Sequence, residues 1–137
     1  MPTHFDALET RTPEARAADL ADALAAQIAR ARALPGYDGR LDGADPAAIT
    51  TPDDLARLPV LRKSDLGRAQ GDAAPLGGLT TRPASGFAHV FQSPGPIYEP
   101  GGEDPDWWRV GRFLHACGVG KGDIVQNCFG YHLTPAG

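Results

Sequence analysis

The chain has 137 residues, of which 42% are hydrophobic and 22% charged, and its formal net charge is −4. This length is that of one domain or of a piece of a larger one, and the composition is typical of a globular protein. The acidic balance argues against nucleic acid as a main partner, and no stretch approaches the roughly 20 consecutive apolar residues of a membrane-spanning helix.

The first predicted element is a helix over residues 13–33. Thr12 is in position to cap it, and Pro13 suits the first helical position, where its missing N–H costs nothing. Apolar residues recur at four-residue spacing along one face: Leu20, Leu24 and Ile28. Pro35-Gly36 ends the pattern.

Two more helix starts follow, at Thr51-Pro52 and at Ser64-Asp65. Together with the first helix they predict a helical N-terminal segment over residues 1–70. Residues 71–86 are rich in glycine and proline and are expected to form a loop.

The pattern changes after this loop. Residues 87–91 are typical of a short buried strand, residues 103–117 of a helix with an apolar face, and residues 124–129 of a second strand. Strand, helix and strand in this order predict a parallel α/β unit. The fold class is therefore α/β, with residues 71–137 as the start of an α/β subdomain.

Thr134-Pro135 repeats the cap-plus-proline signal close to the last residue of the sequence. One interpretation is a chain truncated on its C-terminal side, so that the announced helix and the rest of the sheet belong to a longer protein. The other is a natural terminus after a polar turn. The reading frame downstream of Gly137 distinguishes the two.

Few residues form a pattern that predicts chemistry by itself. Residues 118–123 (GVGKGD) lack the Ser or Thr and the following helix of a Walker-type phosphate loop. The two cysteines, Cys117 and Cys128, do not form a Cys-x-x-Cys pair, and with His115 and His132 they give no metal-ligand spacing. No catalytic triad can be assembled. Two thiols without a disulfide framework indicate a cytoplasmic protein.

Four stretches together resemble the N-terminal part of the phenylacetate–CoA ligase group of adenylate-forming enzymes. Residues 58–66 (LPVLRKSDL) are similar to the family's Leu-Pro…Lys-x-Asp-Leu segment, and residues 75–78 (PLGG) to the Pro-Phe-Gly segment after it. Residues 90–95 (VFQSPG) take the place of the strand and the phosphate loop. Residues 118–125 (GVGKGDIV) are similar to the entry to the next strand.

The resemblance implies a reaction in two steps. A carboxylate attacks ATP, with Mg²⁺ on the phosphates, to give an acyl-adenylate and pyrophosphate, and CoA then displaces AMP to give a thioester. The partners implied are a small aromatic or acyl carboxylate, ATP and CoA. Tyr131 and His132 fall where relatives place residues of the acyl and CoA pocket; the alternative is a strand-end aromatic residue and a solvated histidine.

The phosphate loop departs from the family's Ser-Ser-Gly-Thr-Thr-Gly-Lys-Pro pattern. Ser93, Gly95 and Pro100 match it. The other positions of the loop differ from the pattern, where the family has a serine, two hydroxyl residues, a glycine and a lysine. These positions are Pro94, Pro96, Ile97, Tyr98 and Glu99. A glutamate here repels phosphate. The loop is thus either a variant that holds nucleotide differently or one that has lost adenylation, and by composition alone it is a rigid turn.

Two functions follow. The first is part of an acid–CoA ligase that is inactive alone, because the family's later catalytic elements are absent from these residues. The second is a degenerate or accessory module that binds a partner and catalyses nothing. A fragment of a large sheet leaves strand edges and apolar faces uncovered, which predicts self-association or pairing with the rest of a parent chain.

Overall fold

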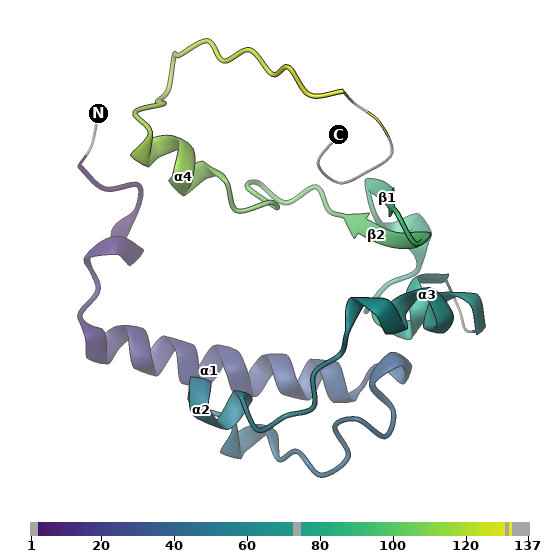
Figure 1. Ribbon diagram of the computed structural model, residues 1–137. Helices are drawn as coiled ribbons and strands as arrows, with labels where there is room; N and C mark the ends of the chain where they lie inside the picture. Colours follow the sequence, from purple (N-terminus) through teal and green to yellow (C-terminus); the bar gives the residue numbers. More distant parts are fainter. Residues whose placement is uncertain (1–2, 73–74, 131, 133–137) are drawn as a thin grey trace.

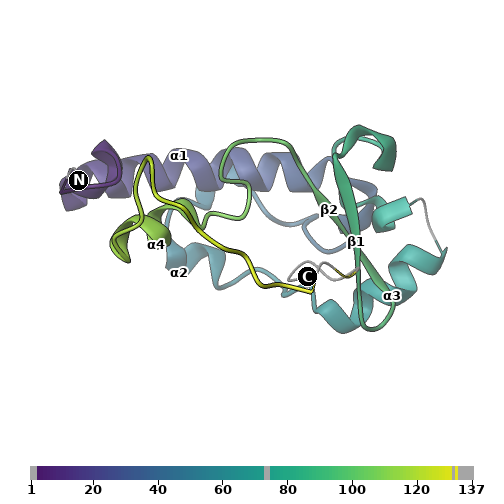
Figure 2. The same cartoon turned by 90° about the horizontal axis from the view of Figure 1, so that it is seen from above.

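The structure is a computed structural model that describes residues 3–72, 75–130 and 132 (Figure 1). Helix α1 (Pro13–Arg32) runs along one side of the molecule. Helix α3 (Lys63–Asp72) and a hairpin of β1 (His89–Ser93) and β2 (Ile97–Gly101) lie near its C-terminal end. Helix α4 (Gly111–Ala116) lies near its N-terminal end, as both views show (Figure 2).

Helix α1 begins and ends close to where its sequence predicts. The Thr12 hydroxyl accepts a hydrogen bond from the Ala15 N–H at 3.2 Å, and Pro13 occupies the first turn. The helix ends at Arg32, one residue before the predicted boundary, and a 3₁₀ turn, η2 (Pro35–Tyr37), follows. These signals are local, which is why they can be read from neighbouring residues alone.

The second predicted start gives only a single turn, α2 (Pro52–Leu55), closed by a capping box. Asp54 donates its N–H to the Thr51 hydroxyl at 3.2 Å, and the Thr51 N–H donates to the Asp54 carboxylate at 3.1 Å. Hydrogen bonding by Thr51 holds the pKa of Asp54 below its ordinary value. The third start gives α3, which begins at Lys63.

The hydrophobic core lies between α1 and the chain that returns beneath it. Ile28 and Ala31 project from the last turns of α1 onto Leu41, Ala44 and Ile49, and all five are buried. Tyr37 and Leu58 pack against this cluster from the side. The core is small, and among the described residues the buried apolar side chains outside it are Leu76 and Ile97.

The sheet differs from the predicted parallel unit. Strand β1 spans residues 89–93, not 87–91, and pairs antiparallel with β2, with Ser93 opposite Ile97 and His89 opposite Gly101. The prolines of residues 94–100 terminate the first strand but do not prevent a return strand, because edge strands tolerate proline. The chain therefore turns back at once instead of crossing over through a helix.

The predicted helix over residues 103–117 is also shorter than its pattern indicates. Asp106 and Arg109 have φ angles of 56° and 58°, in the left-handed region that interrupts a right-handed helix. The Asp106 carboxylate instead accepts the Gly111 N–H at 2.8 Å, and α4 begins there. Trp107 and Trp108 consequently lie in a turn and not on a helix face.

The predicted strand over residues 124–129 does not form: the structure assigns these residues neither strand nor helix. Their side chains are exposed, and a strand without a partner leaves its backbone groups unpaired. At the coarse level the fold class agrees with the prediction, since the structure combines helices with a small sheet, but that sheet is a two-stranded antiparallel one. Among the described residues, no helix has both the length and the apolar character needed to span a bilayer.

Candidate functional site

The predicted phosphate loop is the turn of the hairpin. Ser93 and Ile97 face each other across its base, and both are buried. The Ser93 hydroxyl is 3.4 Å from the Ile97 carbonyl oxygen, to which it donates. Pro94, Gly95 and Pro96 form the turn between them.

Gly95 is required by the geometry of this turn. Its φ angle of 153° is one that side-chain-bearing residues seldom adopt, and a Cβ atom there would lie 3.0 Å from Ile97 Cγ1. If this loop touched a nucleotide, Gly95 would also be the residue least able to change, because a side chain would block close approach of the backbone. The structure gives a different physical reason, the conformation of the hairpin itself.

The turn has little capacity to bind an anion through its backbone. Proline has no N–H, so Gly95 is the one residue of the three that brings a backbone donor. A phosphate site built from backbone groups needs several N–H groups that converge. The turn by itself does not fit a triphosphate.

The acidic residue of the loop is paired with a lysine from α3. Lys63 Nζ donates to Glu99 Oε1 at 3.0 Å. The hydrogen bond from Lys63 lowers the pKa of Glu99 below its ordinary value, against the opposing effect of burial, and the Ser93 hydroxyl favours the carboxylate as well. The loop therefore carries a neutralised charge pair and not an isolated carboxylate.

The same helix holds the outer edge of β2. The Gln70 side-chain amide donates through Nε2 to the Tyr98 carbonyl oxygen at 2.8 Å, and its Oε1 accepts the Tyr98 N–H at 2.8 Å. Gln92 Nε2 donates to the Tyr98 hydroxyl at 3.3 Å from across the hairpin. Tyr98 is thus fixed at its backbone by α3 and at its ring by β1.

Parts of three of the four stretches that carry the family resemblance lie in one unit. Helix α3 begins in the first stretch, at Lys63, and η4 (Pro75–Gly78) is the second; η4 contacts both α3 and β2. Strand β1 lies mainly in the third stretch and pairs with β2, and Leu76 of η4 and Ile97 of β2 are buried. The fourth, residues 118–125, begins with turns after α4 and is exposed over residues 121–125.

The predicted acyl and CoA pocket rests on Tyr131 and His132. Tyr131 lies outside the described residues. His132 is exposed, and its ring lies over Gly130, since a Cβ atom on that glycine would be 3.0 Å from His132 Cδ2.

Lys63 and Gln70 are the residues that sequence reasoning missed. Lys63 lies within the stretch at residues 58–66, where nothing indicates its partner, and Gln70 belongs to none of the four stretches. They are 36 and 28 residues from their partners Glu99 and Tyr98, so no local pattern could relate them.

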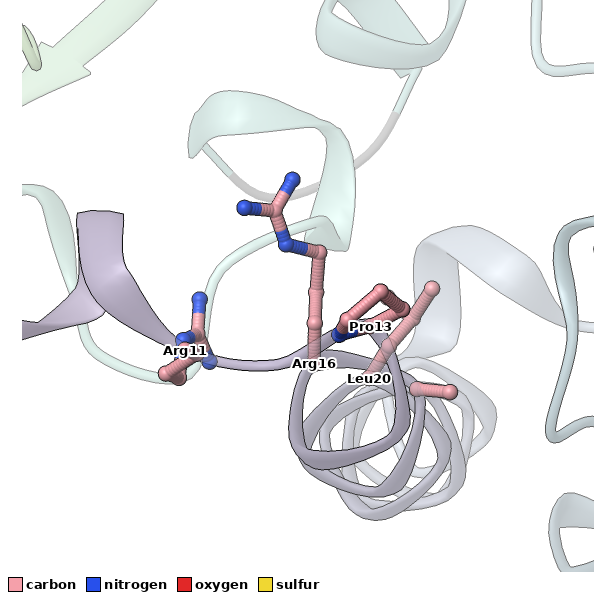
Figure 3. Close-up of a pocket in the computed structure, with 5 residues that line it drawn as sticks. Arg11, Pro13, Arg16 and Leu20 are labelled. Atoms are coloured by element: carbon pink, nitrogen blue, oxygen red, sulfur yellow. The ribbon is translucent and has the colours of Figure 1, made fainter.

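A separate open hollow of about 400 Å³ lies at the first turns of α1 (Figure 3). Its lining is Arg11, Pro13, Arg16, Ala17 and Leu20. Arg11 is paired with Asp19, while Arg16 projects away from the helix beside the hollow. In the described part of the chain, no group of three or more His, Cys, Asp or Glu residues is placed to hold a metal ion.

Comparison of the chain with protein-family models, with curated proteins and with solved structures found no match in any of the three.

Proposed function

We propose that this chain is the N-terminal part of an acid–CoA ligase of the phenylacetate–CoA ligase type. Such an enzyme activates a small aromatic or acyl carboxylate with ATP and Mg²⁺ and transfers the acyl group to CoA. In this proposal the packed unit of α3, η4 and the hairpin is a wall of the nucleotide side, and the chain alone is inactive. The proposed location is the cytoplasm, in keeping with the free thiols of Cys117 and Cys128.

One observation carries the proposal. Helix α3 begins in the stretch at residues 58–66, η4 is the stretch at 75–78, and β1 of the stretch at 90–95 pairs with β2; α3, η4 and β2 contact one another. Because η4 follows α3 directly in the sequence, the contacts that support the proposal are those that both make with β2. Segments that form one unit of a nucleotide site meet in this way.

The described residues do not make an ATP site by themselves. Lys63, a cation that contacts the loop, already has Glu99 as its partner, and one N–H at Gly95 does not cradle a polyphosphate. Stabilising the charge that develops during adenylation takes several positioned cations and donors. Catalysis by the 137-residue chain is therefore not expected.

The ion pair of Lys63 and Glu99 also favours a second function. A neutralised loop, together with the exposed apolar side chains of Trp108, Phe113 and Phe129, suits a degenerate module that binds a protein partner and has lost adenylation. The two functions differ in one measurable respect, which is carboxylate-dependent chemistry on ATP.

The test is exchange of labelled pyrophosphate into ATP, with phenylacetate and a panel of aryl and acyl acids. The protein is the product of the complete reading frame that encodes this chain, and the 137-residue chain is the matched control. We expect acid-dependent exchange by the first and none by the second. A reading frame that ends at Gly137, or no exchange with any acid, would contradict the proposal and favour the partner-binding module.

A further inference from the structure

The chain exposes more surface than a compact protein of its size. Its accessible surface is 9922 Å². A compact monomer of 14.4 kDa exposes about 6,800 Å², so the excess is about 3,000 Å². Obligate homodimers bury about 2,000–5,000 Å² in total, which is about 1,000–2,500 Å² per chain, so the excess is large enough to supply such an interface.

Much of the uncovered apolar surface lies in residues 124–129 (IVQNCF). Ile124 is 100% exposed, and Val125 and Phe129 are 60% and 63% exposed. Val, Ile and Phe are strand-forming residues. Across the described residues, no hydrogen bond joins this segment to β1 or to any other element; the one hydrogen bond it makes is internal, from the Phe129 N–H to Asn127 Oδ1.

The segment is fixed where it begins. Gly118 and Val119 donate to the carbonyl oxygens of His115 and Leu114, both at 2.9 Å, and the Asp123 carboxylate accepts the Gly120 N–H at 2.7 Å. These turns anchor the chain to the end of α4. Residues 124–129 therefore emerge from a fixed point as an exposed strand-forming segment.

The hairpin presents a complementary edge. At β2 the outer edge is occupied at Tyr98 by the Gln70 amide, which takes the place of a further strand. Strand β1 has β2 on one side, and no described residue hydrogen-bonds to the backbone of its other side. An open strand edge of this kind is a template for pairing with another strand.

We propose that two copies of this chain form a symmetric dimer in which residues 124–129 of each copy add as a strand to the β1 edge of the other. In this exchange, residues 124–129 of each copy gain backbone hydrogen-bond partners, and the open β1 edge of each copy is covered. The two contacts are identical, so the interface is closed by a two-fold axis. Dimerisation goes beyond the proposed function and concerns the 137-residue chain, since in a longer parent protein the remainder of the sheet would cover the same strand and edge.

The exposed surface area favours pairing of residues 124–129 with a second copy over pairing with β1 of the same chain. A strand of six residues, about 20 Å long, covers only a small part of an excess of about 3,000 Å². Reciprocal exchange also brings together the apolar faces beside the strands, where Trp108 contacts Phe91 at 5.6 Å between ring centroids and Val90 is exposed.

The first experiment measures molar mass by light scattering during gel filtration at micromolar concentration. We expect twice the 14.4 kDa of one chain. Val125→Lys introduces a charge into the exchanged strand and should restore the mass of one chain. The matched control is Val60→Lys, because Val60 is an equally apolar side chain, 72% exposed, and lies outside the proposed interface. This control should remain dimeric.

The second experiment identifies the strand that occupies β1. In a Cys117→Ser background, Cys128 is the remaining native thiol, and Val90→Cys or Gln92→Cys places a second thiol on β1. We expect mild oxidation to give a covalent dimer that reducing agent separates. A monomer that is cross-linked internally would show pairing within one chain. That outcome, a monomeric wild-type protein, or no cross-link from either variant would overturn the proposal.

Discussion

The side-chain amide of Gln70 makes two hydrogen bonds to the backbone of Tyr98, one to its N–H and one to its carbonyl oxygen, both at 2.8 Å. A primary amide presents a donor and an acceptor side by side, as the backbone of a neighbouring strand does. Gln70 thus closes the outer edge of β2 and connects the hairpin to α3, across 28 residues of sequence.

Replacing this amide should loosen the hairpin. Gln70→Ala removes two hydrogen bonds, each worth about 0.5–1.5 kcal/mol, so we expect a loss of about 1–3 kcal/mol in the free energy of unfolding. Amide hydrogen exchange at the Tyr98 N–H should accelerate accordingly. Gln27→Ala is the control, since Gln27 lies on the exposed side of α1. Equal effects of the two substitutions would show that the Gln70 contact contributes nothing specific.

Stability should depend on pH through Glu99. Its pKa is lowered in the folded state by the hydrogen bond from Lys63, so the unfolded chain binds its proton more readily. The contribution of Glu99 to the free energy of unfolding is fully present above the ordinary glutamate pKa of about 4.3. It is lost as the pH falls through the lower pKa of the folded state.

The pair is partly exposed, and we expect at most about 1 kcal/mol from it. Urea unfolding measures this contribution between pH 3 and 7, which is roughly the range over which carboxylates titrate. Lys63→Met should flatten this part of the profile. A Lys63→Met profile with the same slope as the wild type would exclude the pair as its source.

The turn should tolerate no side chain at its glycine. Gly95→Ala adds a Cβ atom 3.0 Å from Ile97 Cγ1 at a φ of 153°, and strain of this kind costs on the order of 1–3 kcal/mol. Gly43→Ala is the matched control, because nothing lies within 4 Å of its added Cβ. Thermal unfolding should separate the two variants clearly. A Gly95→Ala protein as stable as Gly43→Ala would mean that the turn adopts another conformation.

If the loop meets a phosphate group, reversing its charge should strengthen binding. Glu99→Lys replaces repulsion by attraction and frees Lys63, so affinity for ATP should rise about fivefold, which corresponds to about 1 kcal/mol. Glu103→Lys makes the same charge change in an exposed position after β2 and is the control for a general effect of net charge. Titration calorimetry on the full reading-frame product measures both. Unchanged or weaker affinity for Glu99→Lys would assign the loop a structural role.

Arg112 should hold the N-terminal segment against α4. Its guanidinium pairs with Asp6 at 2.7 Å and Glu9 at 3.1 Å and lies over the Phe5 ring at 5.4 Å. We expect Arg112→Ala to cost about 1 kcal/mol and to increase proteolysis within residues 3–11. Arg109→Ala is the control, because Arg109 is an exposed arginine in the bend that precedes α4. Unchanged protection in Arg112→Ala would show that other contacts hold this segment.

Local signals in the sequence determined the helices of the first half. Thr12 with Pro13 and Thr51 with Pro52 predict the starts of α1 and α2, because a cap acts on N–H groups two or three residues away. The spacing of Leu24 and Ile28 likewise predicts the face of α1 that meets the core. These predictions required no knowledge of distant parts of the chain.

Only the tertiary structure decided which strand candidates pair and what surrounds the loop. Residues 124–129 have the composition of a strand but no partner within the described chain, whereas residues 97–101 contain a proline and form one beside β1. A strand exists only through its neighbour, so its own residues do not determine it. For the same reason Glu99, an isolated repulsive charge in the sequence, becomes a paired one, since the lysine that meets it comes from 36 residues away.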